Sequence, residues 1–565
     1  MTRIPRIPES VVIKHGSKAW PLGLAGAGLI IIGSLLPWSV DPQILDDLSI
    51  AFNPGALQKM AIALALLAVV LLLARKGPLT SLGRWVDAAK GLGALTLWTL
   101  IFMVGVVVAI TVEAGGLVNV EPGCWISLVG ALVLFGASRL LVPTKTRDMA
   151  EARLPGWAEI LVIVAIMAAV LFSTAYALNL SDAWSFVLFL EFLASVVVVG
   201  SATGVVSWLG HLTNRHRHVL ILSTFVVAFS FPFTQNGSDA NMSIATQVLI
   251  FAAAAMGLNI VVGLAGLLDL GYIAFLGAGA YVGATLSTSA FATIGWKPPF
   301  FIVVLLGACV SATLGLIIGA PTLRVSGDYL AIVTLGFGEI FRLSMFNLDG
   351  NNGPNLTNGP NGIPAIPDLT IGSFNFGDTH TLLGIPLARF SNYYFLLLLL
   401  LAFIILVFTR LNNSRIGRGW VAIREDEKAA EAMGVNVFGL KILAFVVGAF
   451  LAGMAGTIKA HQDVSVTPDQ YIFLESAFLL AAIVLGGMGT VVGVLIGSVI
   501  LKLLPEKLRF FADYRLMLFG LLLVLMMRFR PEGLIASRRR QLEFHEDDEE
   551  LAIRIEHSHV EDVTT

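Results

Sequence analysis

The sequence predicts an all-α polytopic membrane protein with about 14–16 transmembrane helices. Of its 565 residues, 56% are hydrophobic and only 13% are charged, and the mean hydropathy is +0.84. Soluble domains carry about 25% charged residues, so the composition argues against a water-soluble fold. Apolar runs long enough to cross a bilayer as a helix, which takes about 20 residues, recur along almost the whole chain.

Sixteen apolar runs are candidate spans, each bounded by charged residues or by Gly, Pro and Asn. The first is too long for the hydrophobic region of a signal peptide and lacks a small-residue cleavage site, so we expect it to remain as an anchor. The runs cover residues 20–38, 57–74, 92–112, 124–142, 157–178, 184–207, 218–234, 244–267, 271–291, 299–320, 328–346, 392–409, 439–460, 470–488, 490–504 and 513–528.

The basic residues predict the orientation of these spans, because Lys and Arg in short loops collect on the cytoplasmic side. With the N-terminus in the cytoplasm, about three-quarters of the basic residues fall on that side, and the C-terminus lies there too. We therefore expect a multi-pass membrane protein with both termini in the cytoplasm. This threading places four basic residues on the outside: Lys502, Lys507, Arg509 and Arg515. Their position leaves open whether residues 490–504 cross the membrane or re-enter it.

Composition divides the chain into three regions. Residues 1–240 form a transmembrane extension of about seven spans without a dense polar motif. Residues 241–535 are richer in glycine and in polar groups within apolar runs. Residues 536–565 form a charged tail that we expect in the cytoplasm.

Several classes of function lack their sequence signatures. No G-x-x-x-x-G-K-[ST] motif occurs, so any energy from ATP would have to come from another subunit. The net charge of −2 predicts no nucleic-acid partner, and the histidines at 545, 557 and 559 lie in the acidic tail without ligand spacing. We expect no enzyme activity, no cofactor or metal bound by this chain, and membrane lipid as its surroundings.

Glycines at four-residue spacing favour close helix packing in lipid, as in Gly279 with Gly283 and Gly315 with Gly319. The sequence Gly486-Gly-Met-Gly489 instead predicts a break at membrane depth. Such a break is tolerated where protein or a water-filled cavity covers the backbone.

Ionisable residues within apolar runs are costly unless they are paired or face water. Glu339 and Arg342 are spaced to meet on one helical face, either as a structural ion pair or on a transport pathway. Glu475 stands near the start of a span, where it either caps or packs the helix or lies on the transport pathway.

A long loop at 410–438 is predicted on the cytoplasmic side. Its segment from Val421 to Met433 suits one short helix, which Gly434 ends as a C-cap glycine. A short helix between two spans has the shape of a docking element, although a solvated loop helix would have the same pattern.

Six motifs resemble the LivM-type permease of branched-chain amino-acid ABC importers, and they occur in that family's order over about half the chain. They are Met256–Phe275, Arg324–Glu339, Asn358–Pro364, Ala422–Gly434, Leu485–Thr490 and Arg528–Leu534. The resemblance implies a core of about 8–9 helices. It also implies three kinds of partner: a homologous LivH-type permease, two cytoplasmic ATP-binding subunits that use ATP and Mg²⁺, and a periplasmic substrate-binding protein. The location that it implies is the bacterial inner membrane.

The resemblance further identifies the 410–438 loop as the coupling loop to the ATPases. The family pattern is Glu-Ala-Ala, three residues, then Gly; here Ala429, Ala430 and Gly434 match, and Lys428 stands at the glutamate position. We expect the loop to act through Arg418, Arg424, Glu425, Glu427, Lys428, Ala429, Ala430 and Gly434.

These observations predict a permease subunit that moves branched-chain amino acids into the cytoplasm by alternating access. Its cargo could instead be urea, a short amide or an aromatic acid, and an ion-coupled secondary transporter is the other alternative. Candidate pathway residues are Asn259, Gly271, Tyr272, Glu339, Arg342, Glu475, Gly487 and Gly489.

Overall fold

The computed structural model describes residues 19–535 apart from 142–153, 323–328, much of 509–532 and isolated positions at 42, 46, 47, 49, 82, 84, 352 and 383. Within these residues, twelve helices are long and apolar enough to cross a membrane, and two shorter apolar helices accompany them. The predicted all-α polytopic fold is confirmed. The predicted tail at 536–565 and the start of the motif at Arg324 lie outside the described residues.

The chain folds as two compact units, Met1–Thr234 and Gln235–Thr565. The helices of the first unit are α2 (Ala19–Ser34), α3 (Ala56–Arg75), α4 (Ala88–Glu113), α5 (Pro122–Arg139), α6 (Gly156–Asn179), α7 (Ala183–Thr203), α8 (Val205–Arg215) and α9 (Arg217–Ser230). Glycines bring α2 against α5, since a Cβ on Gly26 would lie 2.9 Å from the Gly130 carbonyl oxygen.

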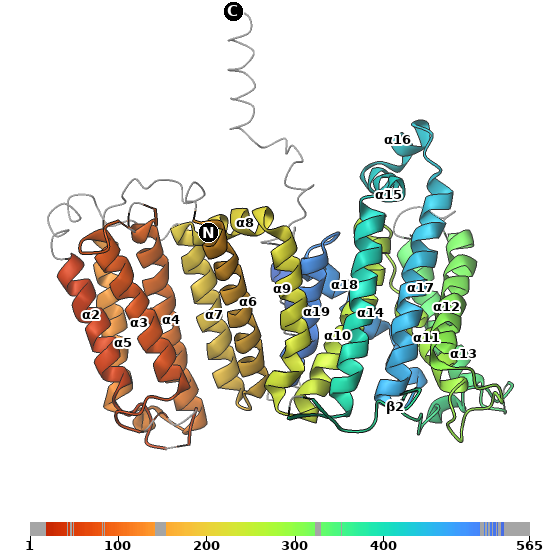
Figure 1. Ribbon diagram of the computed structural model, residues 1–565, viewed down its shortest axis with the longest axis horizontal. Coiled ribbons are helices and arrows are strands. Elements are labelled where there is room, and N and C mark those ends of the chain that lie inside the picture. The colour runs from red at the N-terminus through yellow and green to blue at the C-terminus, as the bar shows by residue number, and fades with distance from the viewer. Residues whose placement is uncertain are drawn as a thin grey trace, which may run out of the picture. The chain divides into compact units, whose positions relative to one another are not determined.

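The predicted span at 184–207 is too long. Its helix, α7, ends at Thr203 because Gly204 adopts a left-handed conformation with a φ of 86°. The short helix α8 follows and runs crosswise to α7 (Figure 1). Left-handed backbone favours glycine, which carries no Cβ to clash.

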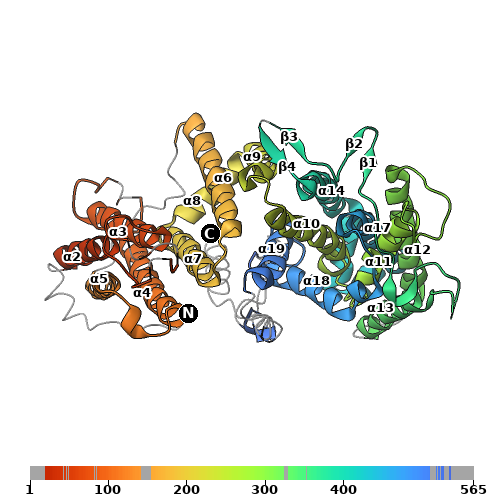
Figure 2. The ribbon, with the colours of Figure 1, turned by 90° about the horizontal axis from the view of Figure 1, so that it is seen from below.

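The second unit contains a bundle of helices and two short β-hairpins at one end (Figures 1 and 2). The helices are α10 (Asp239–Asn259), α11 (Ile273–Thr285), α12 (Phe300–Thr322), α13 (Tyr329–Asn347), α14 (Arg389–Asn412), α15 (Arg415–Glu425), α16 (Glu427–Ala432), α17 (Val437–Asp463), α18 (Phe473–Gly486) and α19 (Val491–Lys507). The π-helical turn Ile260–Leu264 continues α10, and the 3-10 turn Pro468–Tyr471 precedes α18. The antiparallel hairpins pair β1 (Thr370–Ile371) with β2 (Phe374–Asn375), and β3 (His380–Leu382) with β4 (Ile385–Leu387).

The second half of α10 and the π-helical turn after it are deeply buried, and every residue from 250 to 265 is buried. The predicted close packing through glycine is confirmed, because a Cβ on Gly279 of α11 would overlap the backbone of Gly453 in α17. A Cβ on Gly315 of α12 would lie 2.9 Å from the Cβ of Ala449 in α17.

Helices α18 and α19 form an antiparallel hairpin around the predicted glycine break. A Cβ on Gly493 would lie 2.5 Å from the Gly486 carbonyl oxygen, and one on Gly497 would overlap Ala482 further from the turn. The predicted run at 490–504 is therefore a helix that returns alongside its predecessor. Of the predicted span at 513–528, the described residues cover only part.

Candidate functional site

Two short helices form the 410–438 loop, whereas the sequence predicts one. Asp426 has an extended backbone with a φ of −153°, which ends α15. Its carboxylate then accepts a hydrogen bond from the Ala429 N–H at 3.0 Å and caps the start of α16. The sequence pattern does not reveal this boundary, because helix-forming residues lie on both sides of Asp426. An aspartate in such a sequence can act as an N-cap and start a new helix. Gly434 follows α16 with a φ of 82°, as its expected C-cap position requires.

The loop is fixed to the beginning of α17. Trp420 is completely buried, and its indole N–H donates to the Leu440 carbonyl oxygen at 2.7 Å. Lys441 forms an ion pair with Glu427 at 2.6 Å. These contacts attach both α15 and α16 to the first residues of α17.

The outer side of the loop combines small and apolar residues with charges. Ala430 faces the protein, whereas Ala429 and Ala432 are exposed, and the Met433 side chain is 85% exposed beside them. Five of the other predicted docking residues are also exposed: Arg418, Glu425, Glu427, Lys428 and Gly434.

Arg424 turns inward instead. Its Nη1 donates a hydrogen bond to the Gly263 carbonyl oxygen at 2.8 Å, and its Nη2 donates to Glu425 at 2.8 Å. Gly263 lies in the π-helical turn that continues α10. Such turns leave carbonyl groups outside the regular helical ladder and occur often at functional sites.

Asn259 lies one turn before Gly263 and holds the glycine break between α18 and α19. Its side-chain oxygen accepts from the Gly489 N–H at 2.9 Å, and its amide donates to the Thr490 carbonyl oxygen at 3.3 Å. Gly487 and Gly489 have φ values of 123° and 76°. We call Arg424, Gly263, Asn259 and Gly489 the loop–break link, because together they connect the loop to the break.

Gly271 and Tyr272 lie at a packed junction before α11. The Tyr272 hydroxyl donates to the Gly448 carbonyl oxygen at 2.7 Å, and the Gly271 N–H donates to the Asp269 carboxylate at 2.9 Å. The backbone of Thr334 packs so close to Gly271 that a Cβ would overlap it. These two predicted pathway residues therefore join helices α11, α13 and α17.

Glu339 and Arg342 form the ion pair that their spacing predicts. The Arg342 Nε donates to both carboxylate oxygens of Glu339, at 3.0 and 3.2 Å. Arg342 also contacts Asp469 at 3.3 Å, at the end of the unit opposite the loop. The pair is separate from the loop–break link.

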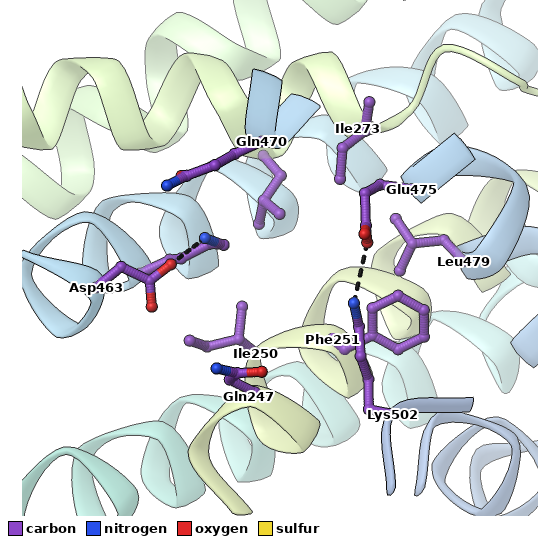
Figure 3. Close-up of a pocket in the computed structure, with 11 residues that line it drawn as sticks. Gln247, Ile250, Phe251, Ile273, Asp463, Gln470, Glu475, Leu479 and Lys502 are labelled. Carbon is purple, nitrogen blue, oxygen red and sulfur yellow. Dashed lines mark hydrogen bonds and ion pairs between the residues drawn. The ribbon is translucent and has the colours of Figure 1, made fainter. Parts of the chain in front are cut away.

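Glu475 lies on the wall of a cavity of about 240 Å³ (Figure 3). It forms an ion pair with Lys502 of α19 at 3.0 Å. A second ion pair, Lys459 with Asp463 of α17, lies on the other side of the cavity (Figure 3). The remaining lining residues are Gln247, Ile250, Phe251, Ile273, Leu276, Gln470 and Leu479.

The site residues predicted from the sequence do not include Lys459, Asp463 or Lys502. A signal was available, because Lys459 and Asp463 have i, i+4 spacing at the end of a predicted span and Lys502 interrupts an apolar run. Ionisable residues in such positions are paired or face water. The partner of each could not be read from helical spacing alone, since Glu475 and Lys502 belong to different helices.

Comparison with known proteins gives a consistent result for the second unit. The family model of the branched-chain amino acid transport system permease component matches residues 241–527. The high-affinity branched-chain amino acid transport permease LivM of Salmonella typhimurium is 39% identical over 338 residues, which are 58% of this chain and 76% of that protein. LivM of Escherichia coli K12 is 38% identical over 340 residues, with the same coverage of 58% and 76%.

A more distant relative covers less of the chain. The branched-chain permease LivH of Escherichia coli K12 is 32% identical over 125 residues, 22% of this chain and 40% of that protein. No solved structure gives a significant match. The matching region contains the loop, the glycine break and the cavity, so the chain belongs to the family of permease components of branched-chain amino acid transport systems.

Proposed function

We propose that this chain is the transmembrane permease subunit of an ATP-driven importer for branched-chain amino acids. It works with a LivH-type permease, two cytoplasmic ATP-binding subunits that use ATP and Mg²⁺, and a periplasmic substrate-binding protein. Family membership and the names of the LivM and LivH relatives support this assignment. The bacterial inner membrane is its location, with both termini in the cytoplasm.

The main support for the ATP-driven mechanism is the exposed side of α16. Alanines at 429 and 432 leave a low surface next to the exposed Met433, and a short helix of this kind fits an apolar groove on a partner. The loop lies at one end of the bundle (Figure 1). Its basic residues favour the cytoplasmic side, where the ATPases bind.

Movement of the docked loop reaches the transport path along two connections. Trp420 and Lys441 carry it into α17, and Arg424 carries it through Gly263 to the end of α10. Asn259 then passes the displacement to Gly489. Because glycine adopts left-handed conformations without steric cost, the break is a natural hinge for alternating access.

The path for the amino acid runs beside this break. The peptide groups of Gly487 and Gly489 are hydrogen-bonded to Ile483, Thr490 and Asn259. A movement of the break frees them to receive the charged end of the solute, as broken helices do in other transporters. The side chain of a branched-chain amino acid passes along the apolar walls of α10 and α18.

Reconstitution of the complete complex in proteoliposomes tests this function. We expect uptake of radiolabelled leucine that requires ATP inside the vesicle and loaded binding protein outside, and that continues when a protonophore collapses the proton gradient. Loss of uptake on adding the protonophore, with ATP still present, would instead indicate an ion-coupled secondary transporter. Uptake of urea, a short amide or an aromatic acid in preference to leucine would reassign the cargo.

A further inference from the structure

The cavity of Figure 3 has a charge pattern that family membership does not explain. Each of its two ion pairs supplies one cation and one anion, Lys502 with Glu475 and Lys459 with Asp463. Between 20% and 31% of each of the four side chains is exposed. Charges within a membrane bundle are costly unless they are paired or face water, and these four residues do both.

Apolar side chains complete the wall. Ile250 of α10 lies between the two ion pairs, whereas the Phe251 ring lies beside Lys502 and Leu479 lies beside Glu475 (Figure 3). The Lys502 ammonium lies 4.6 Å from the centre of the Phe251 ring, which holds the cation at the boundary of the polar and apolar surfaces. The cavity therefore presents both signs of charge next to a surface suited to a hydrocarbon group.

An unsatisfied hydrogen-bond acceptor lies in the same wall. The side-chain oxygen of Gln470 is buried and has no hydrogen-bond partner among the residues that the structure describes. Buried polar atoms of this kind usually have a partner. An ammonium group in the cavity would supply the missing donor.

Both the size of the cavity and its position in the unit suit it to receive a small solute. Drug-sized ligands occupy pockets of roughly 300–1,000 Å³, so a volume of about 240 Å³ suits a smaller molecule. Helix α17 has 27 residues and spans about 40 Å. Since the 410–438 loop precedes α17 and Lys459 lies near its other end, the cavity is at the end of the unit opposite the loop.

We propose that this cavity is a receiving site for an α-amino acid zwitterion with an apolar side chain. The carboxylate of the solute pairs with the lysine of one ion pair, and its ammonium pairs with the acid of the other and with Gln470. The hydrocarbon group lies against Ile250 and Phe251. This inference rests on the proposed function and adds the residues that recognise the charged end of the cargo.

Exchange of partners makes such a site reversible. In the empty cavity each charge is neutralised by its own partner. The bound zwitterion adds one charge of each sign, so two of the four side chains exchange partners with it, and the two side chains that they leave have opposite signs. The net charge of the cavity is therefore zero both when the solute is bound and when it has left. A single fixed charge would lack this property, because it would be left unpaired in one of the two states.

The test uses the complete complex in proteoliposomes, with binding protein and radiolabelled leucine outside and ATP inside. Lys459→Met and Lys502→Met each remove one cation, and Glu475→Gln/Lys502→Met removes one whole ion pair without leaving a lone buried charge. Lys90→Met is the matched control, because Lys90 is a mostly exposed lysine in an ion pair of α4. For each of the three cavity variants we expect leucine imported per ATP hydrolysed to fall about tenfold or more, whereas the control behaves as wild type.

An exchanged pair separates recognition from a merely structural role. Glu475→Lys/Lys502→Glu keeps the ion pair but reverses its direction, so we expect normal assembly with leucine import still low. Import restored to the wild-type level by the exchange, or unaffected in the lysine-to-methionine variants, would overturn the assignment of the cavity. A wild-type complex that imports no leucine would instead contradict the proposed function, so the two failures are distinguishable.

Discussion

The two ends of the second unit are built in different ways. At the loop end, backbone groups meet closely, and Arg424 and Asn259 reach other helices and the glycine break through hydrogen bonds to main-chain atoms. At the opposite end, charged side chains surround a cavity and pair with one another. Helix α10 reaches both ends, with Asn259 at one and Phe251 on the cavity wall.

The difference separates two tasks along one helix. Main-chain contacts at the loop end leave little freedom, which suits the transmission of a displacement. Exchangeable ion pairs at the cavity end suit a charged solute that must bind and leave. Substitutions at the loop end should therefore alter coupling to ATP, whereas substitutions at the cavity end should alter recognition.

The largest effect is expected for Trp420→Ala, which breaks the attachment of the loop to α17. Removing a fully buried tryptophan costs about 3–5 kcal/mol, and the Leu440 carbonyl group also loses its donor. We expect a lower unfolding temperature of the purified complex and ATP hydrolysis without leucine import. Trp157→Ala, at an exposed position on α6, is the control, and equal behaviour of the two variants would contradict the role of the anchor.

Asn259→Leu should have the next largest effect, because it releases the glycine break. The Gly489 N–H loses its acceptor in a buried region, at a cost of about 1–3 kcal/mol. We expect reduced stability together with fewer leucine molecules imported per ATP. The comparison variant is Asn347→Leu at an exposed helix end, and a loss of import as large in this variant would show that the effect is not specific to the break.

Ala432→Arg tests the exposed side of α16 without disturbing the bundle. Ala432 is exposed, so the unfolding temperature of the isolated permease should stay the same. A bulky charge on a docking face should weaken binding of the ATPases about tenfold, which corresponds to about 1.4 kcal/mol. Co-purification and a binding titration measure the affinity for the ATPases, and Thr293→Arg, at an exposed position outside the loop, is the control. Unchanged ATPase binding by Ala432→Arg would exclude this face from the interface.

Glu339→Gln should have the smallest effect. Its carboxylate is 42% exposed and paired with Arg342, and such pairs contribute about 0–1 kcal/mol. We expect a small loss of stability and normal leucine import, with or without a protonophore. A large loss of import would indicate that Glu339 and Arg342 belong to the transport pathway, and it would favour the ion-coupled alternative.

Much of this architecture follows from local patterns in the sequence. Apolar runs and four-residue glycine spacing predict the helices and their close contacts, and the spacing of Glu339 and Arg342 predicts their ion pair. Asp426 shows where such patterns stop, because residues on both sides of it favour helix and only the backbone conformation reveals the break. The cavity and the loop–break link depend on residues more than 20 positions apart, such as Glu475 with Lys502 and Arg424 with Gly263, which helical spacing does not relate.

The loop–break link is tested most directly by the ratio of leucine imported to ATP hydrolysed in the reconstituted complex carrying Arg424→Met. This substitution removes the hydrogen bond to Gly263 and leaves the exposed side of α16 in place, and Arg415→Met at an exposed position of α15 is the matched control. Our account predicts that the complex assembles and hydrolyses ATP while the ratio falls about tenfold, since a hydrogen bond to a charged group contributes about 1.5–3 kcal/mol. A ratio equal to that of wild type and of the Arg415→Met control would contradict it.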